Sequence, residues 1–282
     1  MGKAAALALV PHNPAQLWIA ARNPTTGAAA ISEIRAIAPT SVSVKLLELD
    51  LTSFASIKKA TRHFTAVANR LDILMCNAGI MGGEPGVTNE GYEKQFGTNH
   101  VGHALLVKLL APLLQTAASE PIGTEPRVVF VSSSGHKYTK PPGNIDFATL
   151  HTAQTQYSGI QKYNQSKLAN ALYPRALAKY YPQITSVSIH PGTVETGLFN
   201  TGSNGGGWVV RFLKWIVVPL TAVSVVEGAK SQLWASTAQR IENGKYYEPV
   251  GVSGKEADIA KNEDLVAKLW EWTEKELEGH VL

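Results

Sequence analysis

The chain has 282 residues, of which 44% are hydrophobic and 17% charged, enough to bury a large core within one domain. Its formal net charge of +4 is small for this length and no run of basic residues occurs, so nucleic-acid binding is not indicated. Cys76 is the only cysteine, which excludes an internal disulfide and a thiolate zinc cluster; we expect no metal site and a reducing, cytoplasmic location.

Short runs rich in β-branched residues alternate with longer helical patterns along the chain. The predicted elements in chain order are strand 16–21, helix 25–37, strand 42–48, helix 53–68, strand 73–76, helix 88–115, strand 128–132, helix 156–181, strand 185–190, helix 224–236, strand 245–248 and helix 264–278. This alternation is typical of βαβ units. We therefore predict an α/β fold with a Rossmann-like, doubly wound parallel sheet, in a single domain covering residues 1–282.

Two apolar stretches bear on membrane contact. The N-terminal sequence MGKAAALALVPHNP has one early basic residue and two prolines, which is not typical of a secretory signal. The stretch 208–223, WVVRFLKWIVVPLTAV, is the most hydrophobic in the chain, but it is short for a membrane-spanning helix and carries two basic residues. We expect residues 197–223 to form a flap over a substrate pocket, with contact to a membrane surface as the alternative.

Tyr163 and Lys167 are four residues apart in the predicted helix 156–181 and so lie on one face of it. A phenol with an ordinary pKa of about 10 is a poor acid at neutral pH, but an adjacent ammonium group lowers that pKa. The pair therefore predicts a proton donor for carbonyl reduction, although this spacing also occurs by chance on amphipathic helices. The preceding strand ends in three serines, and Ser133 among them is placed to hydrogen-bond a substrate carbonyl.

Further motifs, in order and spacing, resemble the short-chain dehydrogenase/reductase family and within it the retinol dehydrogenases and WW-domain oxidoreductases. The matching segments are LDILMCNAG at 71–79, FGTNHVGH at 96–103, RVVFVSSSG at 127–135, YNQSK at 163–167, HPGTVET at 190–196, EGA at 227–229 and GKYYEPVG at 244–251. The resemblance covers nearly the whole chain, and it implies a role for individual residues.

In that family, the residue matching Tyr163 exchanges a proton with the substrate, and the residue matching Lys167 lowers the tyrosine pKa and binds the nicotinamide ribose. Ser133 would orient the substrate oxygen, and Asn99 would hold a water molecule for proton relay to the lysine. The further cofactor contacts that the resemblance implies are Asn77, Val194 and Thr196.

Two residues bear on the choice of cofactor. Arg22 follows the predicted strand 16–21 at the position where an acidic residue would bind a ribose 2'-hydroxyl, and arginine there accommodates a 2'-phosphate. We therefore predict NADP(H), with NAD(H) less favoured; the alternative for Arg22 is a surface arginine at a strand end. Asp50 resembles the family aspartate near the adenine amino group, or could instead cap the helix that begins near residue 53.

The family begins with a strand and a glycine-rich turn that lets the backbone approach the cofactor pyrophosphate. Here GKAAALAL at 2–9 resembles only the last glycine of that turn, Gly2, and the helix after it. In the strand order 3-2-1-4-5-6 the strand that is not found is central, so two interior strands would be left with unpaired groups. The hypotheses are a start codon placed too late in a gene model, which we favour, a real truncation, or a degenerate protein that no longer binds a cofactor.

The sequence thus predicts an NADP(H)-dependent oxidoreductase that transfers a hydride between nicotinamide and a carbonyl or secondary alcohol. The aromatic residues of the flap, Trp208, Phe212 and Trp215, predict a hydrophobic substrate such as a polyketide, terpenoid, steroid or retinoid, as in secondary metabolism; packing against the domain is their alternative role. A cofactor-independent lyase, dehydratase or isomerase and a non-catalytic binding protein remain alternatives. The resemblance also implies a homodimer or homotetramer built on helices 88–115 and 156–181.

Overall fold

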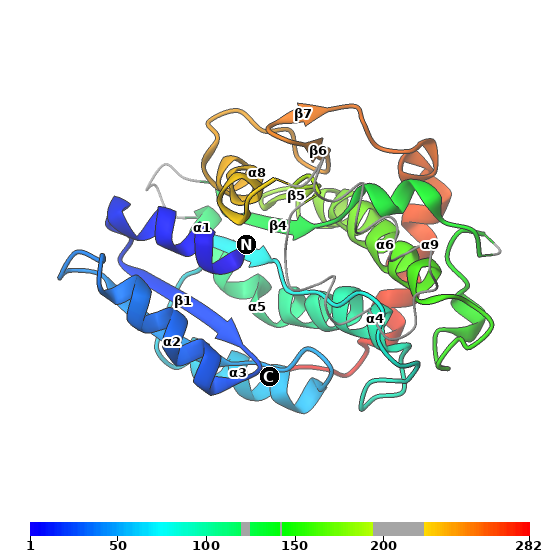
Figure 1. Ribbon diagram of the computed structural model, residues 1–282, viewed down its shortest axis with the longest axis horizontal. Helices are drawn as coiled ribbons and strands as arrows, with labels where there is room; N and C mark the ends of the chain where they lie inside the picture. The colour runs from blue at the N-terminus through cyan, green and yellow to red at the C-terminus, as the bar shows by residue number, and fades with distance from the viewer. Residues whose placement is uncertain (120–124, 142, 194–222) are drawn as a thin grey trace.

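The computed structural model describes residues 1–119, 125–141, 143–193 and 223–282, and within them it confirms the predicted α/β fold (Figure 1). The strands are β1 Gln16–Ala21, β2 Ser43–Glu48, β3 Ile73–Cys76, β4 Arg127–Val131, β5 Thr185–Ile189, β6 Tyr246–Glu248 and β7 Val252–Ser253. The α-helices are α1 Gly2–Leu9, α2 Pro24–Arg35, α3 Phe54–Thr65, α4 Lys94–Phe96, α5 Gly102–Ser119, α6 Gly159–Tyr180, α8 Val225–Thr237 and α9 Glu263–Glu276. Short turns of 3₁₀-helix are η1 Val10–His12, η3 Ser134–Tyr138, η4 Phe147–Thr149 and η6 Asp258–Lys261, and η2 Gly97–Val101 is a π-helical turn.

The helices form two layers, one on each side of the strands. On one side, α1 and α2 pack on β1 and β2 through Ala6, Ile31 and Ile34, while α8 packs on β4 and β5. On the other side, α3, α5, α6 and α9 enclose the largest core, in which Leu105 and Leu172 are fully buried. Strands β4 and β5 are buried along their whole length, as expected for strands covered by helices on both faces.

The predicted helix 88–115 begins later than expected, because the Glu93 carboxylate accepts a hydrogen bond of 2.7 Å from the Phe96 N–H and so caps α4. The helix then passes through the π-helical turn before it continues as α5. By length and hydropathy alone this run, Lys94–Ser119, could cross a membrane, but 67% of its most apolar window is buried inside the protein, and core helices pass the same test.

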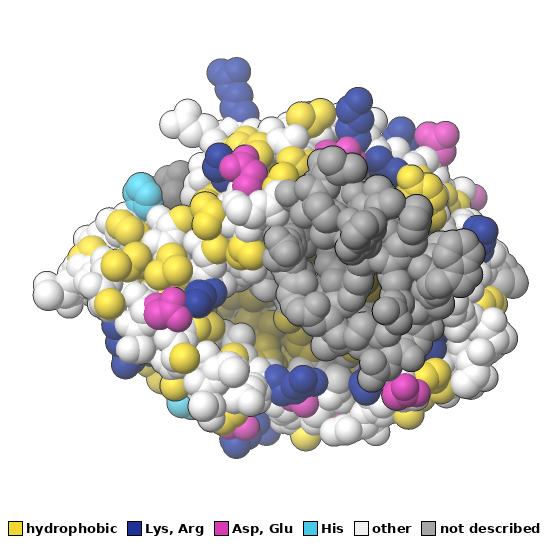
Figure 2. Space-filling model, viewed as in Figure 1, with side chains coloured by type: hydrophobic (Ala, Val, Ile, Leu, Met, Phe, Trp, Pro, Cys, Tyr) yellow, Lys and Arg dark blue, Asp and Glu magenta, His cyan; other side chains and the backbone are white. Residues whose placement is uncertain are grey.

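The strands form two separate sheets. Strands β1 and β2 pair in parallel as one sheet, and the other has the order β3-β4-β5-β6-β7, parallel except for β7. Among the described residues no strand lies between β1 and β3, which is where the sequence predicts a gap. In Figure 1 the arrows of β1 and β4 point the same way, and Figure 2 shows a hollow with a hydrophobic lining near the middle of the same face.

The pairing pattern identifies the backbone groups that face this gap. The Ala21 carbonyl accepts from Leu49 of the β2 side, and the Asp72 carbonyl accepts from Arg127 of the β4 side. Because successive residues of a strand direct their N–H and C=O groups to opposite sides, residues of the other parity point away from these partners. In β1 these are Gln16, Trp18 and Ala20.

We expect this gap to be visible in hydrogen exchange. The N–H groups of Trp18, Ala20, Ile73 and Met75 face the gap and should exchange at least about 100-fold faster than those of Ile19 and Leu74, which face paired strands, because about 3 kcal/mol of opening free energy protects the latter. Residue-resolved exchange measured by NMR tests this. Equal protection of both groups would show that the two edges are paired in solution.

Candidate active site

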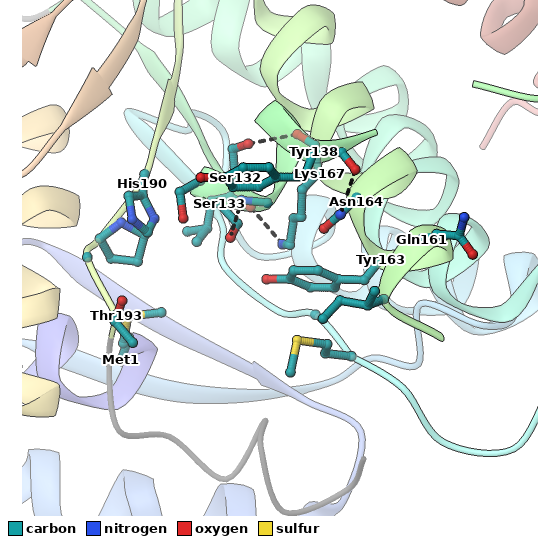
Figure 3. Close-up of a pocket in the computed structure, with 18 of the residues that line it drawn as sticks. Met1, Ser132, Ser133, Tyr138, Gln161, Tyr163, Asn164, Lys167, His190 and Thr193 are labelled. Carbon is teal, nitrogen blue, oxygen red and sulfur yellow. Dashed lines mark hydrogen bonds between the residues drawn. The ribbon is translucent and has the colours of Figure 1, made fainter. Parts of the chain in front are cut away.

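The candidate site lies at the carboxyl ends of the strands, where parallel sheets place ligands. Asn77 follows β3, Ser133 follows β4 and His190 follows β5, while α6 contributes Tyr163 and Lys167. All five line one cavity of about 890 Å³ (Figure 3). The structure therefore brings together three of the four residues predicted as catalytic, Ser133, Tyr163 and Lys167.

Helix α6 presents Tyr163 and Lys167 side by side toward the cavity (Figure 3). The helix starts at Gly159 because Ser158 and Gln161 form a capping box, in which each side chain binds the other residue's backbone N–H. The Lys167 Nζ lies 5.6 Å from the centre of the Tyr163 ring. Both side chains are buried, with 8% of Tyr163 and 3% of Lys167 exposed, so their ionisation is controlled by burial.

The electrostatic balance differs from the sequence-based expectation. Burial raises the pKa of Tyr163 to about 12, and a hydrogen bond with the Ser133 side chain opposes that rise. Burial lowers the pKa of Lys167 to about 8. We expected the ammonium group to lower the tyrosine pKa, but in this structure desolvation dominates, because Lys167 Nζ donates its hydrogen bond of 2.8 Å to the Val131 carbonyl rather than to the phenol.

Asn99 lies in the π-helical turn, and its side chain is used for structure. Its Oδ1 accepts from the Ile80 N–H at 2.8 Å, and its Nδ2 donates to the Ile80 carbonyl at 3.0 Å and to Ser166 Oγ at 2.9 Å. Ser166 Oγ in turn donates to the Tyr163 carbonyl at 2.7 Å. Asn99 therefore ties the loop after β3 to the part of α6 that carries Tyr163 and Lys167. Its role with a relay water stays a prediction.

A nicotinamide cofactor can be tested against the residues around the start of α1. Met1 lines the cavity, and Gly2 lies against Asn77 so closely that a Cβ on Gly2 would be 2.9 Å from Asn77 Nδ2. The N-terminal end of α1 therefore lies at the cavity, where backbone N–H groups of its first turn can bind an anionic group. A Cβ on Gly79 would be 3.2 Å from Asn99 Oδ1 and 3.3 Å from Lys167 Nζ, so the loop after β3 lies close against both side chains here. These residues fit the group.

Arg22 and Asp50 lie outside the residues that line the cavity, each just after the strand that precedes it. Arg22 is exposed after β1. Asp50 Oδ1 accepts from the Thr52 N–H at 2.9 Å and the Thr52 hydroxyl at 2.7 Å, while Ser53 caps α3 through its own side chain. The alternative that Asp50 caps that helix is therefore wrong. Val194, Thr196 and the flap up to residue 222 lie outside the described residues.

Sequence reasoning missed three residues that shape the site. Gln232 of α8 is fully buried and donates to Asn77 Oδ1 at 2.6 Å. A Cβ on Gly135 would be 2.6 Å from the side-chain oxygen of Asn164 on α6, so the turn after β4 packs directly on α6. His136, in that same turn, is fully buried. Each acts through a contact with a distant part of the chain, which no local pattern reveals.

Comparison with known proteins finds matches to short-chain dehydrogenases, the family that the sequence motifs resemble. A family model described as short chain dehydrogenase matches residues 1–205, a region that includes Ser133, Tyr163 and Lys167. Retinol dehydrogenase 12 of Mus musculus is 33% identical over 263 residues, 91% of this chain and 76% of that protein. The WW domain-containing oxidoreductase of Gallus gallus is 32% identical over 239 residues, 82% of this chain and 55% of that protein. The Pseudomonas aeruginosa RhlG/NADP active-site complex shares the fold, with a TM-score of 0.66 and 21% identity over 89% of this chain and 90% of that chain.

Proposed function

Because the chain belongs to the short-chain dehydrogenase/reductase family, as its motifs predicted, and is therefore a dehydrogenase or reductase, we propose that it uses NADP(H) to interconvert a carbonyl and a secondary alcohol of a hydrophobic small molecule. The observation that carries this proposal is the convergence of Tyr163, Lys167 and Ser133 on one cavity. A phenol, an ammonium group and a hydroxyl in one buried space can bind a carbonyl oxygen and deliver a proton to it.

Each residue of the site has a separate role in carbonyl reduction. When bound, a nicotinamide cofactor supplies the hydride that the carbonyl carbon accepts, and Tyr163 donates the proton to the carbonyl oxygen. Ser133 holds that oxygen beside the phenol through its hydroxyl. Lys167, as an ammonium group, favours the phenolate that Tyr163 becomes. In alcohol oxidation the same groups act in reverse, and Tyr163 accepts the proton.

The preference for NADP(H) rests on Arg22 and on the RhlG structure, whose name states that it contains NADP. Arg22 directly follows β1, where a guanidinium group can pair with a 2'-phosphate. We expect Arg22→Ala to raise the Kd for NADPH roughly 10- to 100-fold, because a charge-assisted hydrogen bond contributes about 1.5–3 kcal/mol, and to leave the Kd for NADH unchanged. Calorimetric titration of both cofactors measures this.

The matched control for this prediction is Arg62→Ala. Arg62 is also exposed but lies in the last turn of α3, at the opposite end of that helix from Asp50. The Arg62→Ala variant should bind both cofactors as the wild type does. An equal loss of NADPH affinity in both variants would mean that general positive charge, rather than Arg22, attracts the cofactor.

A hydrophobic substrate is supported by the apolar residues that line the cavity and by the retinol named in one relative. These apolar residues include Met81, Val131, Tyr138, Ile160 and Pro191. Tyr138 and Ile160 are 67% and 56% exposed, so the apolar part of a ligand in the cavity can bury their side chains. NADPH oxidation with retinal, decanal and an aromatic ketone tests the substrate class. Turnover confined to small polar aldehydes would contradict it.

One observation favours a second candidate function. Among the described residues no strand joins β1 to β3, and we keep as the alternative a cofactor-independent lyase, dehydratase or isomerase built on Tyr163 and Lys167. Titration of NADPH into this chain, and into a version extended upstream with a strand and a glycine-rich turn, separates the two. Binding by either form supports the oxidoreductase. Binding by neither would favour the cofactor-independent alternative.

A further inference from the structure

The hydrogen bonds of His136 fix the position of its proton. The backbone N–H of Ala257 points at His136 Nε2 over 3.1 Å, and a backbone nitrogen can only donate. Nε2 must therefore carry the lone pair, and in the neutral ring the proton is on Nδ1. Nδ1 lies 2.6 Å from the Ser133 carbonyl oxygen, which can only accept. Both contacts are satisfied by one tautomer alone.

We propose that His136 is a positioning residue, which sets the orientation of Ser133 by donating its Nδ1–H to the Ser133 carbonyl, while the Ala257 N–H fixes the ring in the tautomer that can donate. This inference rests on the proposed function, since it gives Ser133 the task of holding the substrate oxygen. Ala257 is 121 residues away in sequence and directly precedes η6, so the imidazole is a strut between the turn after β4 and the C-terminal part of the chain.

Ser133 needs such support because it lies at the junction of two elements. It has an extended backbone, with φ −158° and ψ 154°, between the end of β4 and η3. Its Oγ accepts from the Gly135 N–H at 3.1 Å, and its carbonyl accepts from the His136 N–H at 3.1 Å as well as from the imidazole. A rotation of the Ser133 peptide group would move the hydroxyl relative to Tyr163, which lines the same cavity.

The surroundings of His136 keep it neutral. Burial lowers its pKa; the Ser133 carbonyl, Glu248 and Glu256 oppose that shift, and Lys137 adds to it. Lys137 pairs with Glu248 at 2.7 Å, so the effects of these two charges on the ring largely cancel. The ring also packs edge-on against Tyr246, with 4.8 Å between centroids. A second proton, on Nε2, would face the Ala257 N–H, so protonation breaks the strut.

Two substitutions separate the two contacts. In His136→Asn the amide nitrogen reaches the place of Nδ1, so the bond to Ser133 can form while the bond to Ala257 is lost. In His136→Gln the amide reaches the place of Nε2, so the bond to Ala257 can form while that to Ser133 is lost. We expect His136→Gln to lower kcat roughly 10- to 100-fold and His136→Asn to lower it less than about threefold, because displacement of a catalytic group by about 1 Å has effects of that size.

The Kd for NADPH should stay the same in both variants. Thermal unfolding measures the loss of stability that both variants share because a buried residue is changed. Equal losses of kcat in the two variants, in proportion to their Tm, would overturn the proposal in favour of a purely structural role. In a Ser133→Ala background, His136→Gln should cause no further loss, since residues that act as a unit are not additive. Additive losses would show that His136 does not act through Ser133.

A third measurement does not depend on turnover. The ¹⁵N chemical shifts of the histidine rings distinguish the Nδ1–H tautomer from the Nε2–H tautomer, and His136→Asn assigns the signal. We expect a neutral Nδ1–H ring at pH 7 in the protein without cofactor. A neutral Nε2–H ring or a charged ring would refute the proposal. If the ring has the expected tautomer and the wild type shows no NADPH-dependent turnover, the proposed function fails and the strut remains.

Discussion

Tyr163→Phe is expected to lower kcat/KM for carbonyl reduction about 10²- to 10⁴-fold, the range of general acid catalysis. The substitution removes only the hydroxyl, and the ring of Tyr163 stays packed beside Lys167. The Kd for NADPH should remain within about threefold of that of the wild type, because the change affects proton delivery rather than binding. Steady-state kinetics with NADPH and calorimetry together measure both effects. A loss of only a few-fold would remove Tyr163 from the proposed chemistry.

Tyr173→Phe is the matched control. Tyr173 lies on the same helix, is 1% exposed and packs against Trp270 with 5.6 Å between ring centroids. It does not line the cavity. Loss of its hydroxyl should therefore leave kcat/KM within about threefold of the wild type. A comparable drop in both variants would mean that any change in a buried phenol of α6 disturbs the site.

The raised pKa of Tyr163 gives the two directions of the reaction different responses to pH. Reduction needs the protonated phenol, which persists up to a pH near its pKa of about 12. Alcohol oxidation needs the phenolate, whose small fraction rises tenfold for each pH unit below that pKa. The rate of oxidation in the wild type should thus increase with pH through the neutral range. A rate of oxidation that is flat there would show that another group accepts the proton.

The sequence predicts the strands well because each is a short apolar run between turn residues. Strand β1 has the predicted bounds, β4 differs from the prediction by one residue at each end, and β5 differs by one residue at its carboxyl end. Strand β7 was missed because two residues carry no periodicity. The start of the helix predicted from residue 88 was wrong, since the Glu93 carboxylate, rather than the hydrophobic pattern, determines where α4 begins.

In the site, too, features local in the sequence could be predicted, and features that depend on tertiary packing could not. Tyr163 and Lys167 could be paired from the sequence because residues four apart share a face of a helix whatever the tertiary structure. The contact of Gln232 with Asn77 spans 155 positions, so it depends on how α8 packs. The pKa of Tyr163 was predicted in the wrong direction for a related reason. The adjacent ammonium group was visible in the sequence, but the burial of the phenol depends on the whole fold.

Lys167→Met is expected to abolish reduction and yet to stabilise the protein at pH 7. Burial lowers the pKa of Lys167 from its ordinary 10.5 to about 8, so the folded state disfavours the charged ammonium group. That cost is about 3 kcal/mol, since one pKa unit corresponds to about 1.4 kcal/mol. Methionine removes the charge and fills similar space. The Val131 carbonyl, which loses Lys167 Nζ, keeps the hydrogen bond of 3.3 Å from Asn170 Nδ2.

The direction of this stability change follows from the pKa values of Lys167 in the unfolded and the folded protein. Below pH 8 the lysine is charged in both the folded and the unfolded protein, so the wild type bears the full cost; the cost falls between pH 8 and 10.5 and vanishes above. We expect Lys167→Met to raise Tm at pH 7 by roughly 4–8 °C, for a net gain of about 2 kcal/mol after the lost hydrogen bond, and the gain to shrink as pH rises. Differential scanning calorimetry from pH 6 to about 10.5 measures it.

Lys162→Met provides the comparison, because Lys162 is on the same helix and also 3% exposed, but its Nζ donates to the Ala153 carbonyl. Burial raises the pKa of the nearby Glu93 carboxyl, and Lys162 opposes that rise, so loss of this lysine leaves the carboxylate less well compensated. Lys162→Met should therefore lower Tm while NADPH-dependent turnover persists. If both variants are destabilised, the buried charge of Lys167 is compensated in the folded protein. If Lys167→Met alone is stabilised and inactive, the ammonium group is kept at this position for catalysis at the expense of stability.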